Sequence, residues 1–271
     1  MPLLDVNNIA IAFGGLKAVS DFSLSLDRGG LYGLIGPNGA GKTTCFNLLT
    51  GVYRPNAGTI ALDGRSLIGL KPSQIARAGL ARTFQNIRLF GELSVLDNVR
   101  VASHLRLGHG LLGAVARTAG FSREEARITG RAESLLDMFG LYARRFEPSS
   151  SLPYGDQRRL EIARALATDP KVLLLDEPAA GMNPAEKVEL RNLIREVRDR
   201  FKLTILLIEH DMGVVMGLCE HITVLDFGVT IARGTPVQVQ ADERVIEAYL
   251  GTSAHSIDEA IAHDRAEGGS A

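Results

Sequence analysis

The chain of 271 residues has few cysteines, almost no net charge and no long apolar run, and each shortage excludes a class of protein. Two cysteines, Cys45 and Cys219, are too few for a disulfide framework and suit a reducing compartment. The 30 Lys and Arg residues balance 31 Asp and Glu residues, so we expect no nucleic-acid partner. The longest apolar stretches, such as residues 205–208, are far shorter than the roughly 20 residues of a membrane-spanning helix. The N-terminus does not have the pattern of a signal peptide.

The composition is otherwise typical of a globular protein with a substantial core, because 45% of the residues are hydrophobic and 23% are charged. Apolar residues alternate with small or polar ones over 9–13 and 22–26, which predicts half-exposed antiparallel strands. Residues 31–35, 172–175 and 203–208 are apolar without alternation, as in strands that are covered on both faces. Together these patterns predict an α/β fold.

Helical periodicity predicts helices over residues 127–139 and 185–201. Ser122 and Glu125 have the spacing of a capping box upstream of the first of these helices. Gly140 is expected to end the same helix, because glycine is favoured just beyond a helix C-terminus.

The order of these elements predicts one domain over residues 1–251, with an all-helical insertion at about 89–159. Within the insertion, residues 108–120 are rich in glycine and alanine, and either a loop with a short packed helix or a partner contact would fit them. Residues 252–271 end in Gly-Gly-Ser-Ala and are expected to form a flexible C-terminal tail.

The tripeptide Asp226-Phe227-Gly228 matches the magnesium-binding tripeptide of protein kinases, but no His-Arg-Asp loop precedes it. It lies between two short strand-like runs, residues 222–225 and 229–232. We therefore predict a hairpin turn at this point, with no chemical role.

A glycine-rich loop follows the predicted strand 31–35 and matches the pattern G-x-x-x-x-G-K-[ST] at every fixed position. Glycines allow successive backbone N–H groups to converge on an anion, and the helix that follows directs its positive end at phosphates. Lys42 is expected to reach the β- and γ-phosphates and the Thr43 hydroxyl to ligate Mg²⁺. The motif thus predicts binding of ATP and Mg²⁺. The predicted nucleotide-binding residues are Gly36, Pro37, Asn38, Gly39, Ala40, Gly41, Lys42, Thr43 and Thr44.

An acidic pair follows the second apolar strand, residues 172–175. The carboxyl end of such a strand is where α/β sheets hold ligands. Asp176 is expected to orient the magnesium shell, and Glu177 to polarise a water for in-line attack on the γ-phosphate.

Five further motifs occur in a fixed order, and with the phosphate loop they resemble one family closely. They are the aromatic Phe13, the glutamine Gln85, the sequence Leu152-Pro153-Tyr154-Gly155-Asp156, the sequence Ala180-Gly181-Met182-Asn183 and the histidine His210. The chain is similar, over nearly its whole length, to the ATP-binding subunits of ATP-binding-cassette (ABC) transporters. The resemblance implies a P-loop NTPase fold, with a RecA-like core, an antiparallel β subdomain and an inserted helical subdomain.

The resemblance also implies a role for each motif. Phe13 would stack on the adenine, Gln85 would lie in the Q-loop, and His210 would be the switch histidine. The implied catalytic residues are Lys42, Gln85, Glu177 and His210, and the implied metal ligands are Thr43, Gln85 and Asp176. The implied phosphate contacts from the signature loop, residues 152–156, are Pro153, Tyr154, Gly155 and Asp156.

Three positions depart from the family pattern. Pro153 replaces the signature serine and has no backbone N–H. The phosphate contact that the serine makes in the family must therefore come from Gly155 and its neighbours. Asp156 replaces the signature glutamine, and Asn183 replaces the usual D-loop aspartate. A helix that starts near Pro153 would still direct N–H groups at a phosphate.

Residues 82–90, 178–184 and 245–251 are similar to the bacterial branched-chain amino-acid importer subfamily. This resemblance implies a second ATPase subunit, identical or related, that completes two composite ATP sites. It also implies separate membrane permeases and a periplasmic substrate-binding protein, so we expect a location on the cytoplasmic face of the bacterial inner membrane. The residues themselves do not specify the transported substrate.

Four other functions remain open at this stage. The chain could be an ABC ATPase of a different transport or export system, or a soluble ATPase of the same superfamily. A P-loop small-molecule kinase is disfavoured by Gln85, Glu177 and the signature loop. A nucleotide-binding scaffold without hydrolysis is disfavoured because Glu177 and His210 are both present.

Overall fold

The computed structural model describes residues 1–106 and 119–250. The predicted tail, 252–271, lies outside these residues, and so does almost all of the glycine-rich stretch 108–120. Within the described part, no helix has the length and apolar character to cross a membrane.

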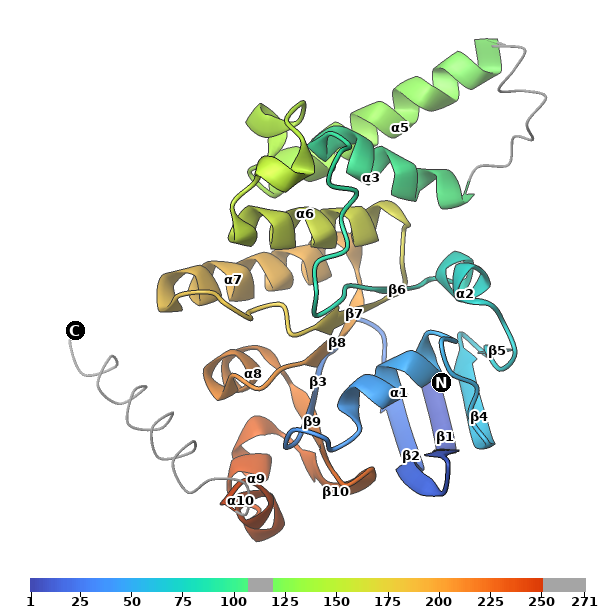
Figure 1. Cartoon of the computed structure of the whole chain (residues 1–271), viewed down its shortest axis with the longest axis vertical. Helices are drawn as coiled ribbons and strands as arrows, with labels where there is room; N and C mark the ends of the chain where they lie inside the picture. Colours follow the sequence, from blue (N-terminus) through green and yellow to red (C-terminus); the bar gives the residue numbers. More distant parts are fainter. Residues whose placement is uncertain (107–118, 251–271) are drawn as a thin grey trace. The chain divides into compact units, whose positions relative to one another are not determined.

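The chain divides into two compact units, drawn in sequence colours in Figure 1. The first unit comprises Met1–Pro72 and Leu174–Ala271, and the second comprises Ser73–Leu173. The second unit is thus an insertion in the sequence of the first.

The first unit contains a four-stranded antiparallel sheet in the order β2-β1-β4-β5. Its strands are β1 (Leu4–Phe13), β2 (Leu16–Leu26), β4 (Ala57–Leu62) and β5 (Arg65–Ser66). Leu4 pairs with Leu26 of β2 and with Leu62 of β4, and all three side chains are buried. The antiparallel strands predicted from alternation are therefore confirmed.

A second sheet of the first unit has the strand order β10-β9-β3-β8-β7. Its strands are β3 (Leu31–Ile35), β7 (Val172–Asp176), β8 (Thr204–Ile208), β9 (His221–Asp226) and β10 (Val229–Gly234). Strand β3 runs parallel to β8 and β9, and every residue of β7 and β8 is buried. The unbroken apolar runs thus form strands that are covered on both faces, as predicted. Strands β9 and β10 form an antiparallel hairpin that turns at Phe227 and Gly228, which confirms the predicted turn.

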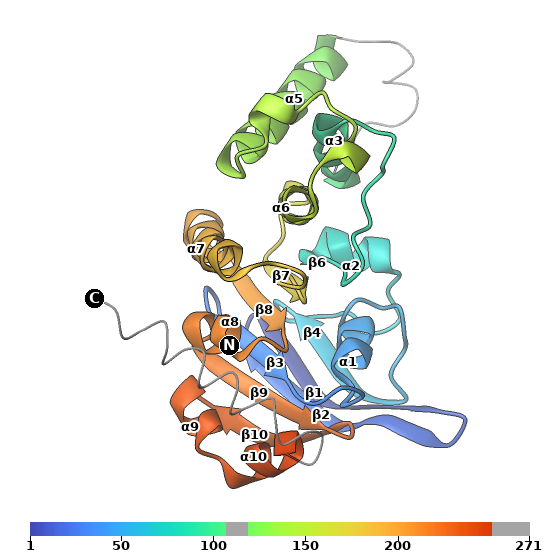
Figure 2. The same cartoon turned by 60° about the vertical axis from the view of Figure 1, so that its left-hand side comes forward.

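Five helices of the first unit are α1 (Lys42–Leu49), α7 (Pro184–Phe201), α8 (Met212–Leu218), α9 (Pro236–Gln240) and α10 (Glu243–Leu250). The predicted helix 185–201 is confirmed as α7, which buries Leu190, Ile194 and Val197. Figure 2 shows α9 and α10 beside the β9–β10 hairpin, with which both helices are in contact.

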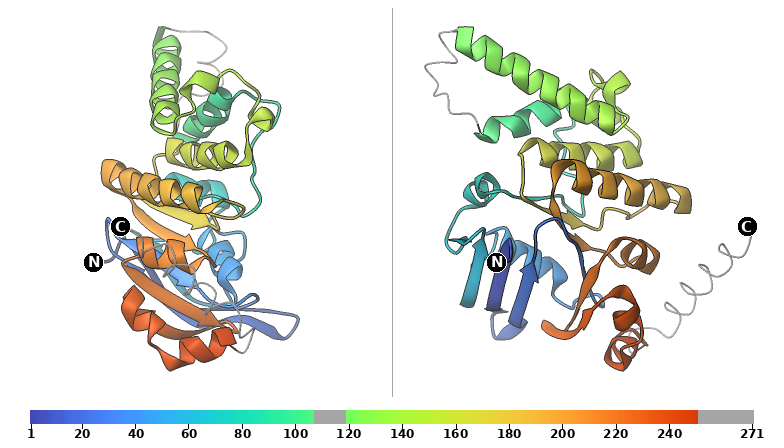
Figure 3. Two further views of the ribbon diagram at one scale, coloured as in Figure 1. Left: turned by 90° about the vertical axis from the view of Figure 1, so that its left-hand side faces the viewer. Right: turned by 180° about the vertical axis from the view of Figure 1, so that it is seen from behind.

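The second unit is mainly helical. Its elements are α2 (Pro72–Ala78), β6 (Leu80–Arg82), α3 (Val95–Ser103), α5 (Ala119–Met138), α6 (Tyr154–Ala167) and the short 3₁₀ helices His104–Arg106, Tyr142–Arg144 and Ser149–Ser151. Helices α3, α5 and α6 pack against one another, as both views of Figure 3 show. Their shared core includes Val99, Leu136 and Leu160, which are fully buried.

The predicted capping box at Ser122 and Glu125 is wrong. Both residues lie inside α5, which already includes Ala119. The strong helix formers Arg123, Glu124 and Glu125 all follow Ser122, so they favour a helix that starts before Ser122 as much as one that starts at it. Gly140 follows the helix in the left-handed region, with φ 69°, so the prediction that it ends the helix is confirmed.

Candidate functional site

The phosphate loop, residues 36–43, connects β3 to α1 and packs tightly against neighbouring backbone. A Cβ atom on Gly36, whose φ is 149°, would lie 2.0 Å from the carbonyl oxygen of Leu225. A Cβ atom on Gly41, whose φ is 102°, would lie 2.8 Å from the carbonyl oxygen of Ala18. Glycine is therefore required at both positions for steric as well as conformational reasons.

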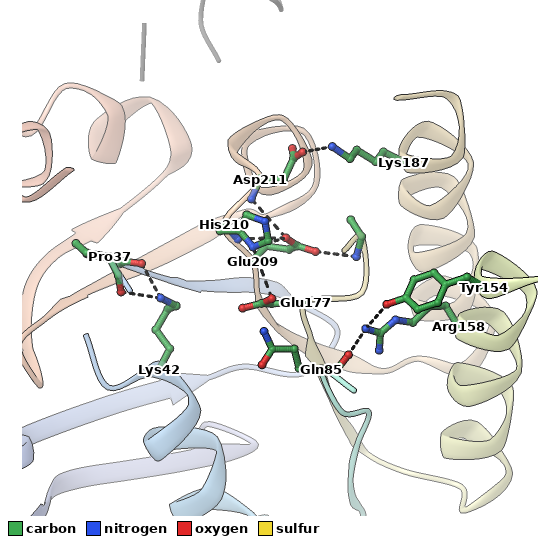
Figure 4. A network of polar contacts seen from close by, with 12 residues as sticks. Pro37, Lys42, Gln85, Tyr154, Arg158, Glu177, Lys187, Glu209, His210 and Asp211 are labelled. Atoms are coloured by element: carbon green, nitrogen blue, oxygen red, sulfur yellow. Dashed lines mark hydrogen bonds and ion pairs between the residues drawn. The ribbon is translucent and has the colours of Figure 1, made fainter. Parts of the chain in front are cut away.

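The Lys42 ammonium is held against this loop. Its Nζ donates hydrogen bonds to the carbonyl oxygens of Gly36, at 2.6 Å, and Pro37, at 2.9 Å, as Figure 4 shows. Burial lowers the pKa of Lys42, while the carboxylates of Glu177 and Asp176 act in the opposite direction. An ammonium has three donors, so this position directs a localised positive charge into the loop.

The backbone of the first turn of α1 adds N–H donors to this charge. Lys42, Thr43 and Thr44 are the first three residues of the helix, and their N–H groups have no intrahelical acceptor. The Thr43 side chain is exposed and thus open to a ligand. Charge, dipole and N–H groups together form an anion site of the kind that binds phosphate.

The predicted acidic pair lies at the end of β7. Asp176 is the last residue of the strand and is buried. Glu177 has φ 48°, in the left-handed region that costs an L-residue about 1–2 kcal/mol, and its N–H donates to the carbonyl oxygen of Ile208 at 2.9 Å. Strained backbone of this kind is concentrated at functional sites, and here it fixes the direction of the Glu177 side chain.

His210 follows β8 and approaches the same carboxylate. Its Nδ1 lies 3.7 Å from Oε2 of Glu177, and its side chain is 62% exposed. Within the first unit, the structure thus brings Lys42, Asp176, Glu177 and His210 together. Their chemical roles stay predictions.

Glu209 is a buried carboxylate at this site that the sequence analysis did not single out. Its Oε1 accepts a hydrogen bond from the N–H of Ala179 at 2.8 Å, and its Oε2 accepts from the N–H groups of His210 at 3.1 Å and Asp211 at 3.4 Å. Burial raises the pKa of Glu209, although these hydrogen bonds and His210 oppose the rise. One side chain therefore joins the segment after Glu177 to the segment that carries His210 (Figure 4).

A second connection runs between α7 and α8. Lys187 Nζ lies 2.5 Å from Oδ2 of Asp211, and Asp211 also caps α8 by accepting from the N–H of Val214 at 2.9 Å. Burial acts to raise the pKa of Asp211, but the hydrogen bonds from Lys187 and Val214 outweigh it, so the pKa lies below its usual value. Asn183, which departs from the family pattern, caps α7 in a capping box with Glu186. The Asn183 amide therefore has a defined local role.

Phe13, the predicted adenine contact, lies at the end of β1 and is 45% exposed. The Tyr53 ring meets it edge-on, with ring centroids 5.2 Å apart and an interplanar angle of 68°. An exposed ring held in this way suits stacking on a flat base.

The second unit contains Gln85 and the signature loop. Gln85 follows β6 with an exposed side chain, and its backbone carbonyl accepts a hydrogen bond from Arg158. Pro153 is the N-cap of α6, and Tyr154, Gly155 and Asp156 form the first turn. The helix thus starts where the sequence predicted, although Pro153 lies just before the first turn. Asp156 pairs with Arg144, with Oδ2 and Nη1 3.2 Å apart.

The donor chemistry of Thr43 and Asp176 fits Mg²⁺. No group of three or more His, Cys, Asp or Glu side chains suited to a metal occurs in the described parts of the chain. Mg²⁺ usually keeps several waters and binds through one or two protein oxygens together with substrate phosphates. A hydroxyl and a carboxylate beside a phosphate loop supply that set.

Comparison with known proteins agrees with this geometry. A family model described as ABC transporter matches residues 19–180. The chain therefore belongs to the ABC transporter family, as an ATP-binding cassette. A second model, described as branched-chain amino acid ATP-binding cassette transporter, matches residues 229–255.

Relatives of known function point to one branch of the family. The chain is 50% identical to the high-affinity branched-chain amino acid transport ATP-binding protein LivG of Escherichia coli, over 92% of this chain and 98% of that protein. It is 45% identical to the corresponding protein BraF of Pseudomonas aeruginosa, with the same coverage. The lipopolysaccharide export system ATP-binding protein LptB of Escherichia coli is 36% identical over 93% of this chain and 98% of that protein.

Solved structures confirm the predicted fold class. A crystal structure of the ADP conformation of MJ1267, an ATP-binding cassette of an ABC transporter, superposes with a TM-score of 0.80 at 30% identity. The match covers 93% of this chain and 99% of that chain. A nucleotide-free ATP-binding cassette from an ABC transporter gives a TM-score of 0.79 at 29% identity, covering 92% of this chain and 99% of that one.

Proposed function

We propose that this chain is the ATP-hydrolysing subunit of an importer for branched-chain amino acids. The observation that carries the proposal is the grouping of Lys42, Asp176, Glu177 and His210 around the phosphate loop. A scaffold that only bound nucleotide would need the loop, but it would not need a carboxylate held at a strained backbone position beside a histidine.

Each residue has a role in this proposal. Lys42 and the N–H groups of the first turn of α1 bind the β- and γ-phosphates, and Phe13 stacks on the adenine. Thr43, Asp176 and Gln85 would hold Mg²⁺, which neutralises phosphate charge when it is bound. Glu177 accepts a proton from the attacking water, while the bond between the γ-phosphorus and the ADP oxygen breaks. His210, 3.7 Å from Glu177, orients this carboxylate and the γ-phosphate.

The composite site needs a second cassette. The first turn of α6 contains Gly155 and Asp156, and its N–H groups would meet the γ-phosphate of ATP bound to the partner subunit. The partner is a second copy or a related chain. Pro153 contributes no N–H group, so we assign this contact to the turn that follows it.

The substrate class follows from the relatives. Identity is 50% to a branched-chain amino acid transport protein and 36% to a lipopolysaccharide export protein. The family model that matches residues 229–255 is also described as a branched-chain amino acid ATP-binding cassette transporter. We infer that separate permease subunits bind this ATPase at the cytoplasmic face of the bacterial inner membrane. A periplasmic binding protein delivers the amino acid to them.

Two measurements test the proposal. The purified chain should hydrolyse ATP only when Mg²⁺ is present, and absence of turnover both alone and with a related cassette would refute the ATPase assignment. Reconstituted with its permeases and binding protein, it should drive uptake of labelled leucine, isoleucine or valine. ATP-dependent movement of another substrate class, with none of these three, would leave the ATPase intact and overturn the substrate assignment.

A further inference from the structure

Two oppositely charged side chains, Arg158 and Glu161, are buried one turn apart on α6. Both side chains are 2% exposed, and Nη1 of Arg158 lies 3.2 Å from Oε2 of Glu161. Removing two charges from water is unfavourable unless their remaining donors and acceptors are satisfied. Their other partners therefore indicate what the pair does.

Those partners belong to the backbone of the Q-loop segment, residues 84–88. Arg158 donates from Nη1 to the carbonyl oxygen of Phe84 at 2.5 Å, and from Nη2 to the carbonyl oxygen of Gln85. Glu161 Oε1 accepts from the N–H groups of Phe84 at 3.2 Å and Arg88 at 3.4 Å. Four backbone groups of one loop are thus bound by two side chains of one helix.

The same pair also reaches the signature loop. Arg158 Nη2 donates to the Tyr154 hydroxyl at 3.0 Å, and its guanidinium lies 5.4 Å from the centroid of the Tyr154 ring (Figure 4). Tyr154 is the first residue of α6. Arg158 therefore contacts the Gln85 backbone on one side and the first turn of α6 on the other.

The arrangement leaves the Gln85 side chain exposed while its backbone is fixed. The aromatic residue before it is also held, because the guanidinium of Arg88 lies 4.3 Å from the centroid of the Phe84 ring. A displacement of the backbone at residue 85 must therefore displace α6, unless the buried hydrogen bonds break.

We propose that Arg158 and Glu161 are positioning residues that fix the Q-loop backbone to the signature helix, so that Gln85 and the first turn of α6 move as one body during the ATPase cycle. The inference rests on the proposed function, because it assigns Gln85 and the signature loop to the nucleotide cycle. Neither Arg158 nor Glu161 needs to touch ATP.

The test uses the full chain with the double substitution Arg158→Met and Glu161→Leu. Replacing a buried ion pair by apolar side chains of similar size removes both charges, so the variant is expected to fold, although the Arg164 guanidinium on the same helix loses the charge of Glu161 that offsets its burial. The matched control is Arg127→Met with Glu124→Leu, an ion pair of the same spacing on α5 whose arginine is 63% exposed. Circular dichroism should give the same helix content for all three proteins.

Amide hydrogen exchange measures the geometric half of the proposal. The amides of Phe84 and Arg88 should exchange at least about tenfold faster in the double variant than in the wild type or the control, because their acceptor is removed. Unchanged protection at both amides would overturn the inference.

Kinetics measure the functional half. ATP affinity should stay within about threefold of the wild type, because the phosphate loop belongs to the first unit, while kcat should fall at least about tenfold. If the amides of Phe84 and Arg88 exchanged faster but kcat stayed within twofold of the wild type, the pair would hold the loop without affecting hydrolysis, and the proposal would be overturned. Loss of ATP binding would also overturn it. A wild-type chain without ATPase activity would refute the proposed function instead, and the exchange result would still stand.

Discussion

Replacing Glu209 by Gln should both destabilise the first unit and slow ATP hydrolysis. The carboxylate accepts three backbone hydrogen bonds with its two oxygens, whereas an amide offers one oxygen and a donor group. Whichever way the introduced amide is oriented, at least one backbone N–H would face another donor. A hydrogen bond to a charged group contributes about 1.5–3 kcal/mol, so losing one should lower the unfolding free energy by about 1.5–3 kcal/mol.

At about 2–4 °C per kcal/mol for a chain of this size, that loss corresponds to a fall in Tm of roughly 3–12 °C. Hydrolysis should fall at least about tenfold below the melting transition, because the segments that carry Glu177 and His210 lose their common anchor. Calorimetry and a phosphate-release assay measure the two effects.

The matched control is Glu186→Gln, the same chemical change in the capping box of α7. Glutamine serves equally well at that capping position, so Tm should move by less than about 2 °C. If Glu209→Gln melted within about 2 °C of the wild type and hydrolysed ATP at the wild-type rate, the anchoring role of Glu209 would be refuted.

Three further predictions follow from the same geometry. Lys42→Ala should weaken ATP binding at least about tenfold in a fluorescence titration. Glu177→Gln should keep the ATP affinity and lower kcat at least about 100-fold. Normal turnover in Glu177→Gln would exclude Glu177 as the general base. Gly36→Ala places a Cβ atom 2.0 Å from a backbone oxygen, so the unfolding free energy should fall by about 1–3 kcal/mol or more in a denaturant titration, and an unchanged midpoint would contradict the packing described for the loop. Burial raises the pKa of Cys45 and of Cys219 to about 12, so neither should react with a thiol reagent at pH 8 until the protein unfolds. Fast labelling of the native protein would contradict the burial. Near pH 9 both thiols would ionise only in the unfolded chain, so their contribution to the unfolding free energy should fall as the pH rises above that value.

Much of the fold could be predicted because the informative patterns are local. The phosphate loop joins a buried strand to a helix within a few residues, and Gly36 and Gly41 occupy positions that only glycine can fill. Strands β7 and β8 were predictable from unbroken apolar runs, because both faces of each strand are covered and neither face needs polar residues. The spacing of Ser122 and Glu125 misled because a capping box is a weak local signal, and the same two residues fit equally well inside a helix that has already started at Ala119.

The site residues that the sequence analysis missed act through contacts between distant segments. Glu209 directly follows an apolar strand, and its burial depends on the N–H of Ala179, 30 positions away. Arg158 and Glu161 would be taken for polar residues on an exposed helix face, and they are buried because loop 84–88, more than 70 positions away, lies against α6. No local periodicity encodes such pairings, so only the three-dimensional structure reveals them.

The most direct test of the composite-site account is the mass of Glu177→Gln in solution, measured by light scattering with and without Mg-ATP. The account predicts a monomer without nucleotide and a doubling of the mass when Mg-ATP is added, either alone or with the related cassette subunit. A variant that binds Mg-ATP but stays monomeric both alone and with that subunit would contradict the account.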